Sequence, residues 1–191
     1  MTKLAKSVRF LTVPPLVVGV LLTFLYAFGN VFSSFLEASL SFLFLAAAPV
    51  LAYPFAALVP ALRRQGREGM RNMAFLFSAV GYAAGLAVSL VLGSIGMRFL
   101  FFVYFGSFLL LAFLNKGVHL RASGHACSVM GPVLLSAFYF GPIPAVCGML
   151  CWGGVLWASV YAKRHTLKEF LLGSACSAVS FAVCAFLLFL L

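Results

Sequence analysis

Acidic residues are almost absent from this sequence. Only three Asp and Glu occur among 191 residues, and charged residues of both signs make up 8% of the chain. A soluble globular domain has about 25% charged residues. A chain with so little charge excludes a soluble enzyme and leaves no room for a separate soluble domain. We therefore predict one integral membrane domain over residues 1–191.

The sequence also lacks the cysteine spacing of a metal site. Its five cysteines, at positions 127, 147, 151, 176 and 184, show neither CxxC nor zinc-finger spacing. Each lies in an apolar run, where we expect a small buried hydrophobic side chain. The cysteines therefore indicate no metal site, and the sequence carries no motif for another cofactor.

A cleavage site of the small-x-small type is missing before Asn30, at the end of the first apolar run. This run, which follows Lys3, Lys6 and Arg9, is therefore expected to remain as a helix and not to be removed as a signal peptide.

Long apolar runs fill most of the chain. The sequence is 64% hydrophobic and its mean hydropathy is +1.15, which is typical of a helical protein with several membrane crossings. A spanning helix needs about 20 mostly apolar residues. This rule predicts an all-α bundle of about seven transmembrane helices. Their expected ranges are 10–28, 38–62, 73–94, 98–114, 123–140, 144–162 and 166 to the C-terminus, with Pro49, Pro54 and Pro60 kinking the second helix.

Basic residues fall on one face of this predicted bundle. Seven crossings place the N-terminus and the loops 63–72, 115–122 and 163–168 together, and leave only Arg98 of the thirteen Lys and Arg on the other face. Under the positive-inside rule the basic face is cytoplasmic. This predicts a multi-pass protein of the cell inner membrane with a cytoplasmic N-terminus. Basic residues that bind phosphate would not report orientation, so the opposite orientation stays open.

A net charge of +10 is compatible with a nucleic-acid partner. The basic residues lie in short loops between apolar runs, which favours anionic lipid head groups as partners over nucleic acid. The sequence does not determine an oligomeric state.

Ionisable residues gather at both ends of the stretch 121–169, around an uncharged apolar hairpin. We expect these two ends to meet, because ionisable groups at membrane depth are costly and usually functional. His165 and Glu169 are four residues apart and share one helix face. A carboxylate there sets the imidazole tautomer and raises its basicity, which would make His165 a nucleophile. Ordinary polarity at a helix start is the alternative.

Ser123, Gly124 and His125 are expected at the start of the helix 123–140. A helix N-terminus offers backbone N–H groups that suit phosphate, and glycine permits a close approach. His125 can act as a general acid. Helix capping by Ser123 is the alternative explanation.

Cationic side chains on the same face are candidates for a phosphate-binding ring, because Arg binds phosphate oxygens bidentately and Lys acts as a point charge. These residues are Arg67, Arg71, Lys116, Arg121, Lys163 and Arg164. Taken singly, each also fits a head-group contact or a topology signal. Taken with the two histidines and Glu169, they favour phosphoryl transfer through a phosphohistidine. Metal binding by His125, His165 and Glu169 is the rival, and the surrounding positive charge argues against it.

These residues resemble the type 2 phosphatidic acid phosphatase superfamily, the histidine-dependent lipid phosphatases related to haloperoxidases. That family has three motifs, KxxxxxxRP, PSGH and SRxxxxxHxxxD. Residues 122–125, ASGH, look like the second motif, and residues 159–169, SVYAKRHTLKE, look like the third. The run 164–166 with Gly173 downstream is similar to the family's entry into its last helix. The resemblance covers residues 121–173 well and 63–175 loosely, with a phosphatase-like core over about 63–191.

The chain departs from the family at all three motifs. Ala122 replaces the Pro of the second motif, and Glu169 replaces the Asp of the third. Ser159 occupies the position of the third-motif Arg, and Lys163 or Arg164 are candidates to replace this phosphate ligand. The first motif has no clean match. Its nearest counterpart is the segment from Arg67 to Asn72, with Lys116 and Arg121 as further candidates.

The resemblance implies a membrane lipid phosphatase that acts on a polyprenyl or glycerolipid phosphate or diphosphate without a metal. It implies His165 as nucleophile, Glu169 as its orienting group and His125 as the acid that protonates the leaving oxygen. Arg121, Ser123, Gly124 and an arginine from position 67 or 71 would hold the phosphate. The first alternative is a catalytically altered protein that binds lipid phosphate with the same pocket.

The second alternative is an unrelated small transporter. It is expected to have Asp or Glu buried within its helices, and the predicted helices hold mainly Ser, Gly and Tyr at their centres.

Overall fold

The computed structural model describes the backbone of residues 3–190, and their side chains apart from positions 3, 4, 6, 9 and 67. This part of the chain is mostly helical and contains no strand. In chain order its elements are α1 (Lys3–Leu11), α2 (Pro14–Phe28), α3 (Phe35–Phe42), the π-helical turn η1 (Leu43–Ala47), α4 (Ala48–Leu58), α5 (Pro60–Arg64), α6 (Arg67–Leu92), α7 (Ile95–Ala112), the π-helical turn η2 (Phe113–Gly117), α8 (Gly124–Phe140), α9 (Pro142–Tyr161) and α10 (Leu167–Phe189).

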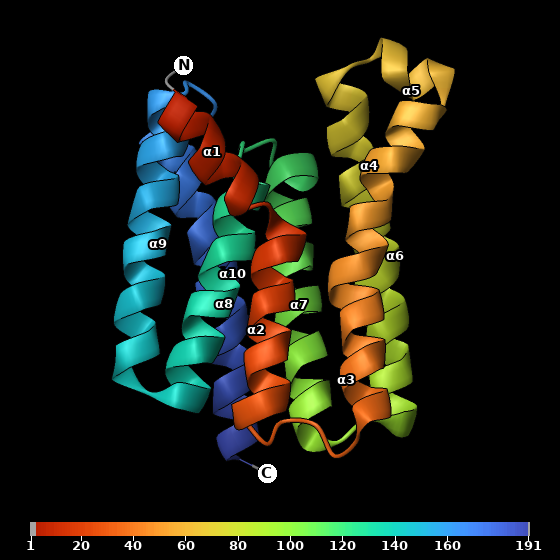
Figure 1. Ribbon diagram of the computed structural model, residues 1–191, viewed down its shortest axis with the longest axis vertical. Helices are drawn as coiled ribbons and strands as arrows, with labels where there is room; N and C mark the ends of the chain where they lie inside the picture. Colours follow the sequence, from red (N-terminus) through yellow and green to blue (C-terminus); the bar gives the residue numbers. More distant parts are fainter. Residues whose placement is uncertain (1–2, 191) are drawn as a thin grey trace.

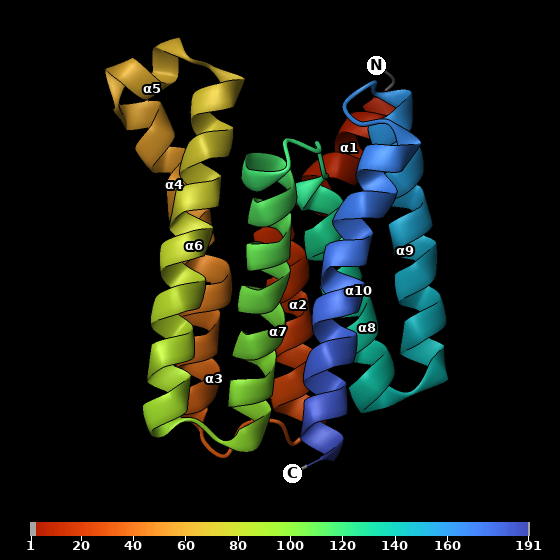
Figure 2. The same ribbon diagram turned by 180° about the vertical axis from the view of Figure 1, so that it is seen from behind.

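The chain runs back and forth between two ends of a helical bundle (Figure 1). One end carries the N-terminus, α5 and the turns 118–123 and 162–166. The other end carries the loops 29–34 and 93–94, the connection between α8 (Gly124–Phe140) and α9 (Pro142–Tyr161), and the C-terminus (Figure 2). The three basic segments therefore lie at the same end of the bundle as the N-terminus, as predicted.

Five helical segments are long and apolar enough to cross a membrane. They are Phe35–Leu58, Glu68–Leu92, Ile95–Gly117, Pro142–Tyr161 and Leu167–Phe189. The apolar helices α2 and α8 are shorter, with 15 and 17 residues. Large apolar side chains such as Leu150 and Phe186 face outward, as expected where lipid replaces water. These features are those of a multi-pass membrane protein, and the predicted count of seven spans stays a prediction.

The start of the first predicted helix, 10–28, is wrong. The helix is interrupted after Leu11 and restarts at Pro14. Proline lacks a backbone N–H and has a fixed φ, so the pair Pro14-Pro15 suits the first turn of a new helix and not the interior of an old one. The predicted loop 63–72 is also wrong, because α5 and α6 occupy most of it.

Prolines shape the second pass as expected. Pro49 follows the π-helical turn η1, and Pro54 lies inside α4. Val59 has an extended backbone, and Pro60 begins α5. The residue before a proline disfavours the helical region, so the pass ends at Leu58 and not at residue 62.

Helix α10 lies between two other helices of the bundle. It packs against α7 on one side and α8 on the other, while α7 separates it from α6 (Figure 2). Small polar side chains allow these close contacts. Ser177 Oγ donates to the Cys127 carbonyl at 2.6 Å, and Ser180 Oγ donates to the Val103 carbonyl at 2.9 Å. Such residues are typical of helix interfaces in membranes.

The cysteines only partly match the expectation of burial. Cys127 and Cys176 are buried between α8 and α10, but Cys147 and Cys151 are exposed on α9. Helix α9 lies at the margin of the bundle, so part of its apolar surface faces outward (Figure 1).

Candidate functional site

The two ends of the stretch 121–169 meet, as predicted. The backbone N–H of Ser123 donates to the carbonyl oxygen of Glu169 at 2.9 Å. Gly173 makes this contact possible, because a Cβ at that position would collide with the backbone of Ser123. The turn before α8 therefore lies directly on the first turns of α10.

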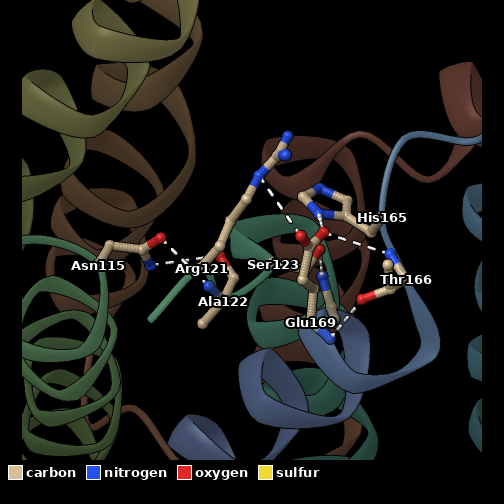
Figure 3. A network of polar contacts seen from close by, with 8 residues as sticks. Asn115, Arg121, Ala122, Ser123, His165, Thr166 and Glu169 are labelled. Atoms are coloured by element: carbon tan, nitrogen blue, oxygen red, sulfur yellow. Dashed lines mark hydrogen bonds and ion pairs between the residues drawn. The ribbon is translucent and has the colours of Figure 1, made fainter. Parts of the chain in front are cut away.

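Glu169 is the centre of the polar network at this junction (Figure 3). One carboxylate oxygen, Oε2, lies 2.9 Å from His165 Nδ1 and accepts from the Thr166 N–H at 3.2 Å. The other oxygen, Oε1, lies 3.7 Å from Arg121 Nε. The carboxylate thus contacts an imidazole, a guanidinium and the backbone at the start of its own helix.

Part of the role of Glu169 is structural. Thr166 is the N-cap of α10, and its Oγ1 accepts from the Glu169 N–H at 3.2 Å. With the reciprocal bond from the Thr166 N–H to the Glu169 carboxylate, this completes a capping box. The N–H and the carboxylate of Glu169 therefore both support the alternative interpretation of a helix-start residue, and the carboxylate additionally contacts His165 and Arg121.

The contact with Glu169 sets the tautomer of His165. An ionised carboxylate only accepts, and its Oε2 also receives the Thr166 N–H, so Nδ1 of His165 must be the donor. In the neutral ring the lone pair is then on Nε2, which points away from Glu169 in Figure 3. The side chains of His165 and Glu169 are only 15% and 17% exposed. This arrangement holds a basic nitrogen in a fixed orientation.

Arg121 lies over the same carboxylate and remains accessible. Its side chain is 58% exposed, and the tip of the guanidinium extends beyond the pair of His165 and Glu169 (Figure 3). An exposed ion pair at this distance contributes little to folding stability. The position of Arg121 is therefore better suited to holding an incoming anion than to holding the fold together.

Asn115 fixes the turn that carries Arg121. Its Nδ2 donates to the carbonyl oxygens of Leu111 and Ala122, at 2.9 and 3.2 Å. Its Oδ1 accepts from the Ala122 N–H at 3.2 Å. This two-way bond closes the turn 116–122 between α7 and α8 and so positions the two residues that flank Ala122.

Ser123 serves as the N-cap of α8. Its Oγ accepts from the Ala126 N–H at 3.3 Å, and its side chain is fully buried. The capping explanation is therefore correct for Ser123, since a hydroxyl below the surface and bound to its own helix is not placed to meet a phosphate. Gly124 is half-buried at the first position of α8, next to this cap.

His125 lies on the first turn of α8, two residues after the Ser123 contact with Glu169. Its Nε2 is 3.1 Å from the hydroxyl of Thr12, at the junction of α1 and α2. The two histidines therefore belong to helix starts at the same end of the bundle.

The predicted cationic ring is only partly assembled. Arg71 is exposed on α6, beyond α7 from α10, so it stands apart from His165. The side chain of Arg67 lies outside the described residues. Lys116 is exposed on the turn that Asn115 closes. Arg164 is half-buried and directly precedes His165.

Ser159 occupies a buried position on α9. Its side chain is fully buried, and its carbonyl accepts from the Arg164 N–H at 3.0 Å. The tight turn 162–166 therefore closes over the position at which the resembling family has a phosphate-binding Arg. Lys163, with a φ of 50°, lies at the exposed corner of this turn.

Three polar residues with structural contacts were not anticipated. Asn115 bonds within its own turn, to Leu111 and Ala122, whereas the contact of Thr12 with His125 is set by packing. The third is Glu37, whose side chain is buried at the opposite end of the bundle. The expectation of no buried Asp or Glu concerned the centres of the predicted helices, and Glu37 lies just before the predicted helix 38–62. Glu37 lies in the first turn of α3 and is not deep within a span, so it does not favour a transporter.

The arrangement of acidic, histidine and cysteine side chains bears on metal binding. Among residues with described side chains, no three His, Cys, Asp or Glu come together in a group that suits a metal ion.

Comparisons with models of known protein families, with curated proteins and with solved structures found no match for this chain.

Proposed function

We propose that this protein is a membrane lipid phosphatase that hydrolyses the phosphate or diphosphate monoester of a polyprenyl lipid or glycerolipid through a phosphohistidine. One observation carries the proposal. His165 is held by Glu169 with its Nε2 lone pair directed away, and the guanidinium of Arg121 lies on the same carboxylate. A basic nitrogen beside an accessible cation suits attack on a phosphorus atom.

In the first step Nε2 of His165 attacks phosphorus and forms an N–P bond. The P–O bond to the lipid breaks, and His125 gives a proton to the leaving oxygen. The phosphorylated imidazole carries a positive charge, which the Glu169 carboxylate at Nδ1 stabilises. Arg121 neutralises the phosphoryl oxygens in the transition state.

In the second step a water molecule attacks the phosphohistidine. His125, now without its proton, accepts one from this water, and the N–P bond breaks to release inorganic phosphate. Both histidines then return to their starting states. The reaction balances without a metal or any other cofactor.

The location of the site suits a lipid substrate. It lies at one end of the bundle, where lipid head groups would be. A shallow apolar groove of about 590 Å³ follows α10 from Lys168 along Leu171, Leu172 and Ala175. A phosphate near Arg121 could therefore extend its hydrocarbon chain along α10. We further propose seven crossings in the cell inner membrane, with this end and the N-terminus cytoplasmic.

The main alternative function is lipid-phosphate binding without catalysis. Ser159 favours this alternative, because a buried serine at this position supplies no cation to the phosphate. Arg121 and Arg164 are the side chains that can compensate.

Phosphate release by the detergent-purified protein distinguishes the two functions. The substrates are a panel of prenyl and glycerolipid phosphates and diphosphates. His165→Ala should abolish release, while His119→Ala, which changes an exposed histidine in the turn before α8, should not. Release that survives in His165→Ala rules out the phosphohistidine. Binding of lipid phosphate without release by the wild-type protein would favour the alternative.

A further inference from the structure

Thr12 reaches a histidine of the candidate site from the far end of the sequence. Its hydroxyl oxygen lies 3.1 Å from Nε2 of His125, although 113 positions separate the two residues. Thr12 follows the last residue of α1 and precedes Pro14, the first residue of α2. It therefore occupies the elbow between the two helices, outside every motif in the sequence.

The hydrogen bonds of Thr12 leave only one role for its oxygen at His125. The hydroxyl also lies 2.7 Å from the carbonyl oxygen of Val8, and a carbonyl can only accept. The single hydroxyl proton is thus used at Val8, as is common for threonine near the end of a helix. The oxygen must then accept at His125, so Nε2 of His125 carries a proton.

This contact determines which atom of His125 exchanges a proton. A neutral imidazole has one N–H, and here it is on Nε2, so Nδ1 holds the lone pair. The cationic ring donates from both nitrogens and keeps the same bond to Thr12. Loss and gain of a proton therefore occur at Nδ1, without movement of the ring.

The elbow is anchored on both sides of Thr12. Val8 of α1 and Val17 of α2 pack against a cluster formed by Ala126, Val129, Val155 and Phe170. Phe170 directly follows Glu169 and is fully buried. The same apolar cluster therefore supports the elbow, the helix of His125 and the helix entered after His165.

We propose that Thr12 is a positioning residue that holds His125 with its proton on Nε2 and makes Nδ1 the atom that gives a proton to the leaving group. The two histidines then have opposite tautomers, with the lone pair on Nε2 in His165 and on Nδ1 in His125. The catalytic consequence rests on the proposed phosphatase function, whereas the tautomer does not.

Nitrogen-15 NMR of ring-labelled histidine in detergent micelles tests the tautomer directly. A His119→Gln background leaves two histidines to assign. In the wild type we expect neutral His125 to be protonated on Nε2. Thr12→Val should shift this population toward Nδ1–H, while Thr12→Ser should keep it. Thr23→Val is the matched control, because Thr23 bonds the Gly19 carbonyl in the same way on an exposed face.

Two results would overturn the proposal. One is a wild-type His125 whose neutral ring carries its proton on Nδ1. The other is an unchanged tautomer population in Thr12→Val.

Phosphate release gives the second readout. Thr12→Val should lower kcat about tenfold with KM unchanged, since general acid catalysis contributes about 10²–10⁴-fold in all. Thr12→Ser and Thr23→Val should stay within about twofold of the wild type. If the wild type releases no phosphate from any lipid, the phosphatase function fails while the NMR result still decides the role of Thr12. If Thr12→Val shifts the tautomer but keeps full kcat, the catalytic part of the proposal is wrong.

Discussion

Two glutamates at opposite ends of the bundle begin from the same local motif and acquire different surroundings. Ser34 caps α3 and accepts from the Glu37 N–H at 3.2 Å, just as Thr166 caps α10 and accepts from the Glu169 N–H at 3.2 Å. Each glutamate also takes a backbone N–H from the residues before its helix. Locally, both are helix-start carboxylates.

The tertiary partners of the two carboxylates differ. Glu37 is 7% exposed and receives the N–H and the hydroxyl of Ser94, at 3.1 and 2.6 Å. Glu169 faces His165 and Arg121. The donors to Glu37 are uncharged and come from Ser33 and Ser94, so Glu37 holds the loops 29–34 and 93–94 together. Ionisable partners give Glu169 the features of a reactive site. The comparison teaches that the motif predicts a helix start, whereas the side chains that the carboxylate meets depend on the tertiary structure.

The largest expected effect separates the two glutamates by activity. Glu169→Gln should lower kcat for phosphate release about a thousandfold, or about 4 kcal/mol, because an amide can donate to Nδ1 and permit the wrong tautomer of His165. Glu37→Gln should leave kcat per folded molecule unchanged. Equal losses in the two variants would remove the functional distinction between the ends.

The second prediction concerns the contribution of Glu37 to folding stability. Glu37→Ala leaves the N–H groups of Ser33 and Ser94 without their acceptor and leaves the Ser94 hydroxyl only the Val31 carbonyl, which we expect to cost about 3 kcal/mol. Thermal unfolding in detergent measures this loss. Glu68→Ala is the control, since Glu68 is exposed and should change stability by less than about 0.5 kcal/mol. Similar melting temperatures of the Glu37→Ala and Glu68→Ala variants would show that Glu37 does not hold the two loops together.

The close contact of α10 with Ser123 provides a third test. Gly173→Ala places a methyl group against the Ser123 backbone and should cost about 2 kcal/mol in stability together with activity. Gly153→Ala on α9 is the matched control, because its Cβ would meet nothing within 4 Å. That control should be neutral, or up to about 1 kcal/mol stabilising, from helix propensity. A stable and active Gly173→Ala would show that the two turns need not touch.

The smallest effect on stability is expected for Arg121. Arg121→Gln should change the unfolding free energy by less than about 0.5 kcal/mol, because the ion pair is exposed. It should raise KM for the lipid phosphate about tenfold, since a charge-assisted contact to phosphate is lost. Arg98→Gln, at the opposite end, should leave KM unchanged. A raised KM in both variants would indicate a general charge effect and not a phosphate contact at Arg121.

The sequence determined the class of the protein and the meeting of its polar ends. Low charge and apolar runs of about 20 residues are sufficient to predict a helical membrane bundle, because a helix of this length crosses the lipid with its backbone hydrogen bonds made within one segment. The stretch 121–169 encloses one helical hairpin, α8 and α9, which returns the chain to the end it left. His165 and Glu169 share a face because a helix has about 3.6 residues per turn.

Boundaries and partners were beyond the reach of the sequence. Pro14-Pro15 was read as the edge of one helix and not as a break between two. Arg71 was expected at the site because helix counting assigns residues to an end of the bundle but does not place them around it. Packing set α7 between α6 and α10 and so kept Arg71 away.

The same division applies to the two glutamates and to Thr12. Local spacing fixed the caps at Ser34 and Thr166, because a cap bonds within its own turn. Only the tertiary structure decided that Glu37 meets Ser94, that Glu169 meets Arg121, and that Thr12 meets His125. Such contacts join helices far apart in the sequence, and their choice depends on the packing of whole helical faces.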